Sequence, residues 1–566
     1  MISNKHISKL ATVLISVCLV LCVVLLAFPN RFILPLVDTA YSMEYESKLF
    51  DTDNIIDINI IMDDATWSEM LENAISENYY ECDVVVNGTT FHSVGIRPKG
   101  NTSLSSIAHD PDNNRYSFKL EFDHYIDGQT CFGLDKLALN NNYADVTNMK
   151  EAIVYDMYKF MGADASLYNY AKISVNDSYW GVYLAIEAVE DSFMHRNFGM
   201  QNGNLYKPDS MDMGDKMNEN GGKMTPPRDM GAMPNRQGQM PPDMPMPNDS
   251  ESGANANSAS TPNDFQMPPQ PTDGSSDIRQ RPDQKQQRTS EQGKHMPSPF
   301  EMGERGGNNW SNLNYIDDDL DSYCAIWDGE VNKTTDADNK RVVTALKNIS
   351  LGSNLEKYLD IDNVLKYMAV HSFVVNDDSL SGNMAHNYYL YESKGKLNIL
   401  PWDYNLSFGG MRSTDASYVI NDPIDTPFSA TKFFDALLKD EQYLKRYHDY
   451  YNKLVNDYVF SGEFHKTYKR IKEQISDLVK TDPNAMYTFD EFVAASDMLY
   501  NTVMLRAQSI KGQLDGTIPS TSENQRTNPD ALLDASSIDI SIMGQFHGGG
   551  GPKDDREFKR PFANPN

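Results

Sequence analysis

Two groups of acidic and amide side chains carry residues suited to phosphate chemistry. The polar stretch 374–387 contains Asp377, Asp378 and Asn383, and Asp403 follows a Pro-Trp pair further along the chain. Transfer of a phosphoryl group requires one carboxylate that orients and deprotonates an acceptor hydroxyl. It also requires a second carboxylate and an amide oxygen that hold Mg²⁺ against the phosphates. The residue types therefore predict a phosphoryl-transfer site in which Asp377 or Asp378 acts on the acceptor.

A predicted β-hairpin brings these two groups together. The strand NYYLYES, a Lys-Gly-Lys turn at 394–396 and the strand LNILP separate Asn387 from Asp403. Because the second strand folds back on the first, Asp403 is expected to return to the level of Asn387. Asn387, at the base of the hairpin, therefore competes with Asn383 as the amide ligand of the metal. The alternative for Asp403 is that it only caps a turn at the end of the strand.

The segment 95–104, GIRPKGNTSL, combines positive charge with a loop that suits phosphate binding. It predicts a strand that runs into a loop rich in Gly, Asn, Thr and Ser, whose backbone N–H groups can cradle phosphate oxygens. A local basic pocket is needed because the formal net charge of the whole chain is -30. The candidate ligand-binding residues of this segment are Arg97, Lys99, Gly100, Asn101 and Ser103.

A strand lysine and a helix glutamate form a further candidate pair. Lys119 lies in the predicted strand YSFKLEF, where alternation places it on the same face as Ser117 and Glu121. Glu151 lies in the helix predicted from DVTNMKEAIVYDMYKFMG. Along the chain they lie in positions similar to those of the phosphate-binding lysine of a kinase and of that lysine's carboxylate partner, a resemblance that implies the same roles here. The alternative is that both residues are exposed surface charges.

Turn and cap signals indicate the elements that position these residues. Asn87-Gly88 and residues 176–177 each separate two alternating runs and predict β-hairpins. Gly162 is expected to end the helix that contains Glu151. The second half of the chain, from 315 to 511, has mainly helical periodicity apart from the hairpin described above. Together these patterns predict an α+β fold.

Composition divides the chain into segments. The Met-, Pro- and Gly-rich stretch 208–309 is expected to be a disordered insert within one domain, because it has too few apolar residues to offset the entropy of ordering it. The insert separates a sheet-rich part at 40–207 from a mainly helical part at 310–515. Residues 516–566 are polar and are expected to form a disordered tail.

The uncharged apolar run at 10–28 is long enough to cross a membrane. Lysines in residues 1–9 place the N-terminus in the cytoplasm, so the bulk of the chain is expected to be extracytoplasmic on a single-pass anchor. A cleaved signal peptide is the alternative. The strongly negative net charge argues against nucleic acid as a partner, because a phosphate backbone would be repelled.

The chain resembles the spore-coat-protein-H (CotH) kinase family, which is related to secretory-pathway atypical kinases. The resemblance covers much of residues 90–207 and 310–515, and the pairing of HNYYLY with PWDYNLSFG is fairly specific. It is carried by RPKGNTSL, YSFKLEFD, LALNNNYADVTNMKEAIVYDMY, ISVNDSYWGVYLAIEAVEDSF, AHNYYLYE and LPWDYNLSFG.

This resemblance implies a two-lobed atypical protein-kinase-like fold with a sheet-rich N-lobe and a mainly helical C-lobe. It also implies ATP-dependent phosphorylation, with Mg²⁺ or Mn²⁺, of Ser or Thr hydroxyls on secreted or surface proteins of the coat or envelope. By position, Lys119 would contact the α- and β-phosphates and Glu151 would fix it. Asp378 would orient the acceptor, and Asn383 and Asp403 would hold the metal.

One departure from ordinary kinases leaves a choice open. Ordinary kinases have His-Arg-Asp at the start of the loop that carries the catalytic aspartate. This chain has Val-Asn-Asp, at 375–377, so the acceptor carboxylate is either Asp377 or Asp378.

Two other function classes are also compatible with these residues. One is a catalytically inactive, kinase-like surface binding or structural protein, and the other is a nucleotidyl transferase, which would use the same kinds of ligands. The sequence predicts no oligomeric state.

Overall fold

The structure is a computed structural model. It describes residues 43–111, 113–199, 203–208, 311–382, 384–411 and 415–546. The predicted membrane span at 10–28, nearly all of the predicted insert at 208–309 and the candidate ligand Asn383 lie outside these residues. Among the residues that are described, no helix has both the length and the apolar character needed to cross a bilayer.

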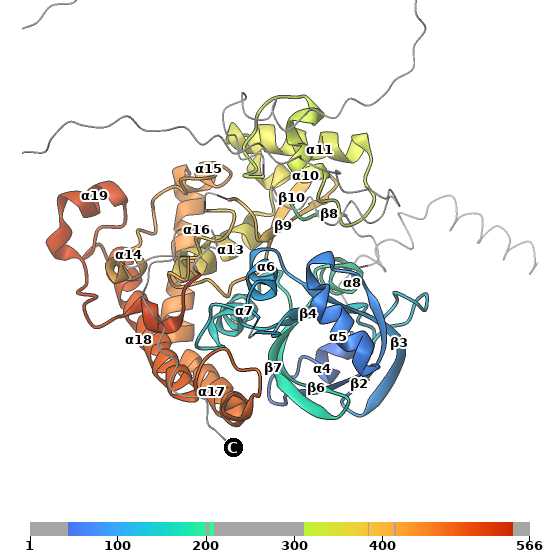
Figure 1. Ribbon diagram of the computed structural model, residues 1–566. Helices are drawn as coiled ribbons and strands as arrows, with labels where there is room; N and C mark the ends of the chain where they lie inside the picture. The colour runs from blue at the N-terminus through green and yellow to red at the C-terminus, as the bar shows by residue number, and fades with distance from the viewer. Residues whose placement is uncertain are drawn as a thin grey trace, which may run out of the picture. The chain divides into compact units, whose positions relative to one another are not determined.

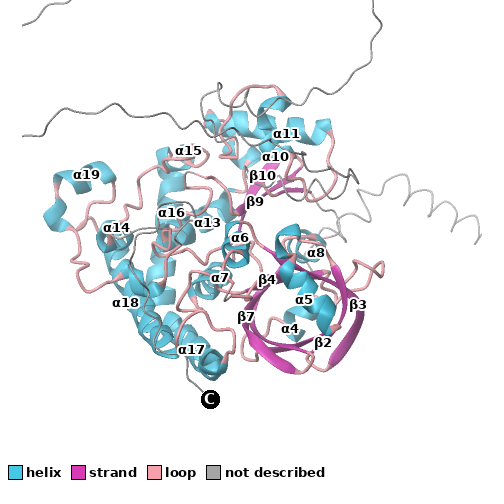
Figure 2. Cartoon of the chain, viewed as in Figure 1, coloured by secondary structure: helices cyan, strands magenta, loops and turns pink. Residues whose placement is uncertain are grey.

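The N-terminal part of the described chain is a closed β-barrel (Figures 1 and 2). The barrel closes where β1 pairs in parallel with β6, and the other neighbouring strands are antiparallel. The sequence predicted a sheet-rich lobe here, but it did not predict that the sheet closes on itself. In their order around the barrel, the strands are β1 (Ile56–Ile61), β2 (Tyr80–Val86), β3 (Thr89–Lys99), β4 (Ser117–Glu121), β5 (Lys136–Asn140), β7 (Ser178–Glu187) and β6 (Tyr168–Val175).

Alternation of side chains explains why these residues form strands with one buried face. In β1, Ile56, Ile58 and Ile60 are almost completely buried inside it, whereas Asp57 between them is exposed. The two N-terminal hairpins turn where the sequence predicted, at 87–88 and 176–177, with left-handed residues in each turn. The barrel interior is therefore filled by apolar side chains, and the polar side chains of the strands point outward.

Helices cover the barrel, and one of them connects it to the rest of the molecule. The helix α7 runs from Lys150 to Met161 and ends at Gly162 in a left-handed conformation, as predicted. Nearly all of α7 is buried, because it packs against both β6 and helices of the C-terminal part. The other short helices of this part are α4 (Glu44–Lys48), α5 (Asp64–Glu72), η1 (Ala74–Ser76), α6 (Thr102–Ala108) and α8 (Asp191–Phe198).

The C-terminal part is mainly helical, which confirms the prediction for 315–511. A small sheet joins β8 (Asn204–Tyr206) to the predicted hairpin of β9 (Tyr388–Ser393) and β10 (Lys396–Pro401). The helical segments are η3 (Leu320–Tyr323), α10 (Cys324–Trp327), α11 (Asp336–Ser350), α12 (Leu355–Tyr358), α13 (Ile361–Val374), α14 (Ala416–Asn421), α15 (Asp435–Lys439), α16 (Glu441–Asn452), the π-helical η4 (Lys453–Phe460), α17 (Glu463–Thr481), α18 (Phe489–Leu514), α19 (Ser522–Thr527), η5 (Pro529–Ala531) and η6 (Ile540–Met543).

A buried ion pair holds the barrel against the helical part. The Arg115 guanidinium, just before β4, lies 2.5 Å from the Asp482 carboxylate at the end of α17, and both side chains are about 2–3% exposed. Asp482 also accepts a hydrogen bond from the backbone N–H of Val182 in β7. Paired charges of this kind resist separation, because breaking the pair would leave an uncompensated charge in a buried site.

The disordered tail predicted for 516–566 is wrong for residues 516–546. These residues form α19, η5 and η6, and Ile540 and Met543 are buried against the main core. Their apolar side chains are few and irregularly spaced, so no periodic pattern marks them in the sequence. Residues 547–566 lie outside the described part of the chain.

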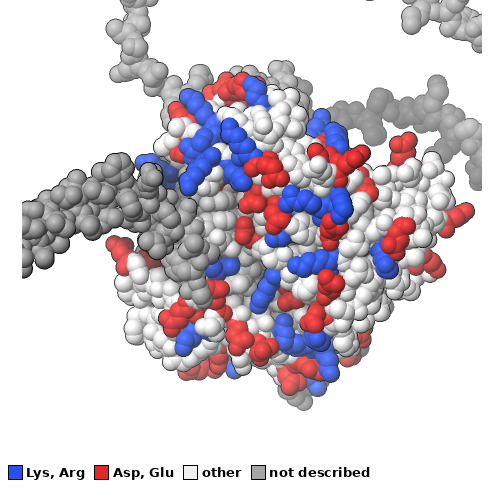
Figure 3. Space-filling view, turned by 180° about the vertical axis from the view of Figure 1, so that it is seen from behind, with Lys and Arg blue, Asp and Glu red and all other residues white. Residues whose placement is uncertain are grey.

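Charge of both signs is spread over the face shown in Figure 3. Lys and Arg side chains lie among Asp and Glu side chains there. The net charge of -30 therefore does not produce a continuous acidic surface on this face.

Candidate active site

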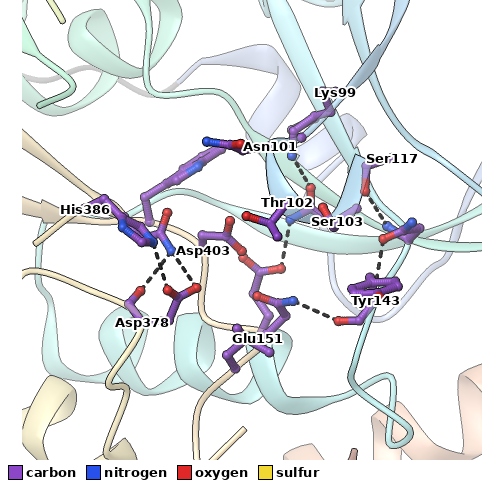
Figure 4. A pocket seen from close by; sticks show the side chains of 18 of the residues that line it. Lys99, Asn101, Thr102, Ser103, Ser117, Tyr143, Glu151, Asp378, His386 and Asp403 are labelled. Atoms are coloured by element: carbon purple, nitrogen blue, oxygen red, sulfur yellow. Dashed lines mark hydrogen bonds and ion pairs between the residues drawn. The ribbon is translucent and has the colours of Figure 1, made fainter. Parts of the chain in front are cut away.

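A cleft lies between the outer surface of the barrel and the loops next to the β9–β10 hairpin. Figure 4 shows Asp403 and Glu151 in its middle, with Asp378 on one side and Lys99 on the other. The structure thus brings together most of the residues proposed from the sequence. Those that line the cleft are Arg97, Lys99, Gly100, Asn101, Ser103, Lys119, Glu151, Asp378, Asn387 and Asp403.

Strand register explains how the barrel presents its basic side chains. Arg97 of β3 pairs with Lys119 of β4, and Lys99 pairs with Ser117. Partners directly opposite each other in a sheet point to the same side. These side chains therefore all face the cleft, while Phe118 between them points into the barrel and is completely buried.

Lys99 is linked to the Glu151 carboxylate of the cleft through Asn140. Its Nζ donates a hydrogen bond to Asn140 Oδ1, and Asn140 Nδ2 donates to Glu151 Oε2 at 2.8 Å. Asn140 thus bridges the lysine and the glutamate. Lys99 also lies over the ring of Trp402, 5.7 Å from its centroid. Burial lowers the pKa of Lys99, and the negative charges of Asp403 and Glu151 oppose that effect.

Glu151 and Asp403 are neighbouring carboxylates that repel each other. Glu151 is 1% exposed, and burial together with the charge of Asp403 raises its pKa to about 8. Burial also raises the pKa of Asp403, while attraction to Lys99 opposes the shift. The backbone N–H of Tyr404 donates to Glu151 Oε1 at 3.3 Å, which ties the two segments together. A cation placed between these carboxylates would relieve their repulsion.

Lys119 does not pair with Glu151, so that part of the prediction is wrong. Its Nζ donates to Glu190 Oε1 at 2.6 Å, and Lys136 donates to the other oxygen of the same carboxylate. Burial would raise the pKa of Glu190, but the two lysines lower it to about 2. Lys99, which was expected to supply positive charge next to the phosphate loop, is instead the lysine that is linked to Glu151, through Asn140.

Asp378 is held in the cleft by two neighbours. His386 Nε2 lies 2.8 Å from Asp378 Oδ1, and Asn387 Nδ2 donates to Asp378 Oδ2 at 3.1 Å. Because its amide nitrogen points at Asp378, Asn387 keeps its amide oxygen as an acceptor or ligand. Asp377 does not line the cleft, and its Oδ1 accepts a hydrogen bond from Tyr418. The geometry therefore favours Asp378 over Asp377.

A buried polar network supports the loops that carry these carboxylates. Tyr404 is the residue that follows Asp403. Its hydroxyl lies 2.7 Å from the Tyr158 hydroxyl of α7 and 3.0 Å from His371 Nδ1 of α13. His371 Nε2 lies 2.7 Å from Ser381 Oγ in the Asp378 loop. Burial lowers the pKa of His371 to about 3, so the ring is neutral. The network thus connects α7, the Asp403 loop and the Asp378 loop.

The donor set fits a Mg²⁺ ion that is shared with phosphates. Within the described ranges, no group of three or more His, Cys, Asp or Glu side chains could hold a metal by itself. Mg²⁺ usually keeps several waters and binds one or two carboxylates together with substrate phosphates, so it does not need such a group. Asp403 and the amide oxygen of Asn387 are ligands of the required type.

Sequence reasoning missed several residues that line the cleft. Asn140 lies in the stretch LALNNNY, where an amide at the end of a strand was the available signal. Tyr143 and Glu190 lie in two of the segments that carry the family resemblance, but no residue spacing marked them as part of the site. Phe546 comes from the segment that was expected to be a disordered tail.

Comparison with known proteins identifies the family of this chain. A family model described as CotH kinase protein matches residues 96–252 and 309–510, which is more than half of the chain. The inner spore coat protein H of Bacillus subtilis (strain 168) is 25% identical over 168 residues. That alignment covers 29% of this chain and 43% of the relative, so the chain matches less than half of the relative's length. On the family match, this chain belongs to the CotH kinase family.

Proposed function

We propose that the chain is an ATP-dependent protein kinase that transfers the γ-phosphate to Ser or Thr hydroxyls of secreted or surface proteins. The observation that carries the proposal is the connected set of Lys99, Asn140, Glu151 and Asp403, which faces Asp378 across one cleft. Phosphoryl transfer depends mainly on positioning and on stabilisation of phosphate charge, and this set provides the charges for both.

Each side chain has a role in this proposal. Lys99 binds the phosphates of the nucleotide, and Glu151 holds it in place through Asn140. Asp378 orients the acceptor hydroxyl and accepts its proton, and His386 keeps the Asp378 carboxylate in position. The bond from the γ-phosphorus to the β,γ-bridging oxygen breaks, a bond to the acceptor oxygen forms, and ADP leaves.

Asp403 and Asn387 would hold Mg²⁺ or Mn²⁺. The ion would neutralise the negative charge that develops on the phosphate oxygens. The loop at Gly100–Ser103 offers backbone N–H groups and hydroxyls on the opposite side of the phosphates.

Two features support a substrate outside the cytoplasm. The apolar run at 10–28 suits a membrane anchor with an outward-facing chain. The curated relative is named as an inner spore coat protein. We therefore propose coat or envelope proteins as the substrate class.

Labelled ATP tests the proposal on the full chain. The protein is incubated with a mixture of surface proteins and Mg²⁺ or Mn²⁺, with ATP labelled at either the γ- or the α-phosphate. The variants are Lys99→Met, Asp378→Asn and Asp403→Asn, and Lys172→Met on β6 is a matched lysine control outside the cleft.

We expect label from the γ-phosphate only, retained in the Lys172→Met control and lost in the three cleft variants. Label from the α-phosphate would instead support a nucleotidyl transferase. If the chain transferred no label and ATP did not raise its melting temperature, the kinase proposal would be refuted in favour of a binding protein.

A further inference from the structure

The last residues that the structure describes, 538–546, return from the helical part to the cleft. We call them the C-terminal strap. Ile540 and Met543 anchor it on α18, where they are 3% and 0% exposed. The Thr502 hydroxyl of α18 lies 3.8 Å from Met543 Sδ. The strap is therefore fixed at one end by apolar burial.

From this anchor, the strap bonds to the segment around the start of α7 and to the loop that carries Asp403. The Val146 N–H, shortly before α7, donates to Met543 O at 3.2 Å. Lys150, the first residue of α7, donates from Nζ to Gly544 O, also at 3.2 Å. In the Asp403 loop, Gly410 O accepts a hydrogen bond from the Phe546 N–H at 2.8 Å. The strap thus links the start of the helix that carries Glu151 to the end of the loop that carries Asp403.

The Lys150 contact is a strong constraint because the side chain is completely buried. Burial lowers the pKa of its ammonium group, and the nearby Asp145 carboxylate opposes the shift. A buried ammonium group needs hydrogen-bond acceptors, and Gly544 O is one of them. Moving the strap away would leave this donor without that acceptor, so the position of the strap and the position of α7 are coupled.

Backbone shape fixes the path of the strap at Gly544. Its φ of +87° lies in the region that favours glycine. A Cβ atom at this position would lie 2.5 Å from Ala144 O, which is closer than van der Waals contact allows. A larger residue here would therefore push the strap away from the segment before α7.

Beyond Gly544, the Phe546 side chain reaches the cleft itself. It packs with Leu406 and Met411 of the Asp403 loop and with Tyr143, whose ring centroid is 6.3 Å away. All four side chains line the cleft. The strap therefore contributes a wall of the candidate active site as well as a tie behind it.

We propose that the C-terminal strap is a positioning element of the active site, which holds Glu151 and Asp403 at the spacing that the nucleotide phosphates and their metal require. The residues before α7 and those after Asp403 are loops, so they depend on contacts such as these for a fixed position. This inference rests on the proposed kinase function. It predicts that loosening the strap weakens Mg·ATP use more than acceptor use.

The test uses the full chain with Phe546→Ala and Gly544→Val, and with Phe546→Leu as a conservative variant. Ile542→Ala is the matched control, because Ile542 lies on the same strap and is 36% exposed. Steady-state kinetics give KM for Mg·ATP and for the acceptor separately. Hydrogen–deuterium exchange without nucleotide reports on peptides from 144–153 and 403–411.

We expect Phe546→Ala and Gly544→Val to raise KM for Mg·ATP at least about tenfold, with little change in KM for the acceptor. Both should speed exchange in the two peptides, while Ile542→Ala and Phe546→Leu stay close to the unsubstituted chain. Equal changes in both KM values, or unchanged exchange in the two peptides, would overturn the inference. If the unsubstituted chain does not use ATP, the proposed function fails, and the exchange data still decide whether the strap holds the two loops.

Discussion

Replacing Glu151 by glutamine should make the stability of the protein depend less on pH. The carboxyl group is 1% exposed, and its pKa is raised from 4.5 to about 8 by burial and by the charge of Asp403. Glutamine has nearly the same shape and keeps an oxygen that can accept from Asn140 or from the Tyr404 N–H. Glu151→Gln therefore removes the charge without opening a cavity.

The direction of the effect follows from the sign of the shift. A carboxyl whose pKa is raised on folding favours the folded state at low pH, and this contribution is lost as pH rises from about 4.5 to about 8. The slope attributable to one such group is at most about 1.4 kcal/mol per pH unit. Over the whole window, the ionised Glu151 lowers the free energy of unfolding by roughly 3–5 kcal/mol.

Urea unfolding of both proteins at pH 5, 6, 7 and 8, in buffer with EDTA to remove metal ions, measures this difference. At pH 5 the two free energies of unfolding should be similar, and at pH 8 Glu151→Gln should be the more stable protein. Glu72→Gln, an exposed glutamate on α5, serves as the control and should follow the unsubstituted chain. A difference between Glu151→Gln and the unsubstituted chain that does not change with pH would refute the reasoning.

Three further predictions concern charged side chains. Arg506 is completely buried and donates to backbone carbonyls at the ends of α13 and α14. Arg506→Met should therefore lower the free energy of unfolding, measured with urea, by about 3–5 kcal/mol. The control Arg526→Met, at an exposed arginine, should lower it by less than about 0.5 kcal/mol. Asp482→Ala removes the partner of the buried Arg115 and should lower the free energy of unfolding by a similar amount. The measurement is Tm, which should fall. Calorimetric titration with Mg·ATP should show a larger rise in Kd for Lys99→Met than for Lys119→Met, because only Lys99 lies beside the paired carboxylates.

Local signals were sufficient to predict the elements that carry the site. The hairpin turns at 87–88, 176–177 and 394–396 and the end of α7 at Gly162 are set by residues that tolerate left-handed or tight-turn backbone, and these act over a few residues. The β9–β10 hairpin was therefore enough to predict that Asp403 and Asn387 line the same cleft.

Pairing across the barrel could not be read in the same way. Alternation shows that Lys99 and Lys119 each lie on the polar face of a strand, but it does not show which carboxylate each one meets. That choice depends on Asn140 at the end of β5 and on Glu190 just before α8. Closure of the sheet is equally non-local, because it requires β1 to pair with β6.

The most direct test of the account is a crystal structure of the full chain with Mn²⁺ and a non-hydrolysable ATP analogue. Anomalous scattering locates Mn²⁺ independently of the rest of the structure. We predict a Mn²⁺ peak within coordinating distance of the Asp403 carboxylate, with the analogue's phosphates between that ion and the Lys99 ammonium group. A Mn²⁺ peak found only away from Asp403, or phosphates bound away from Lys99, would contradict the account.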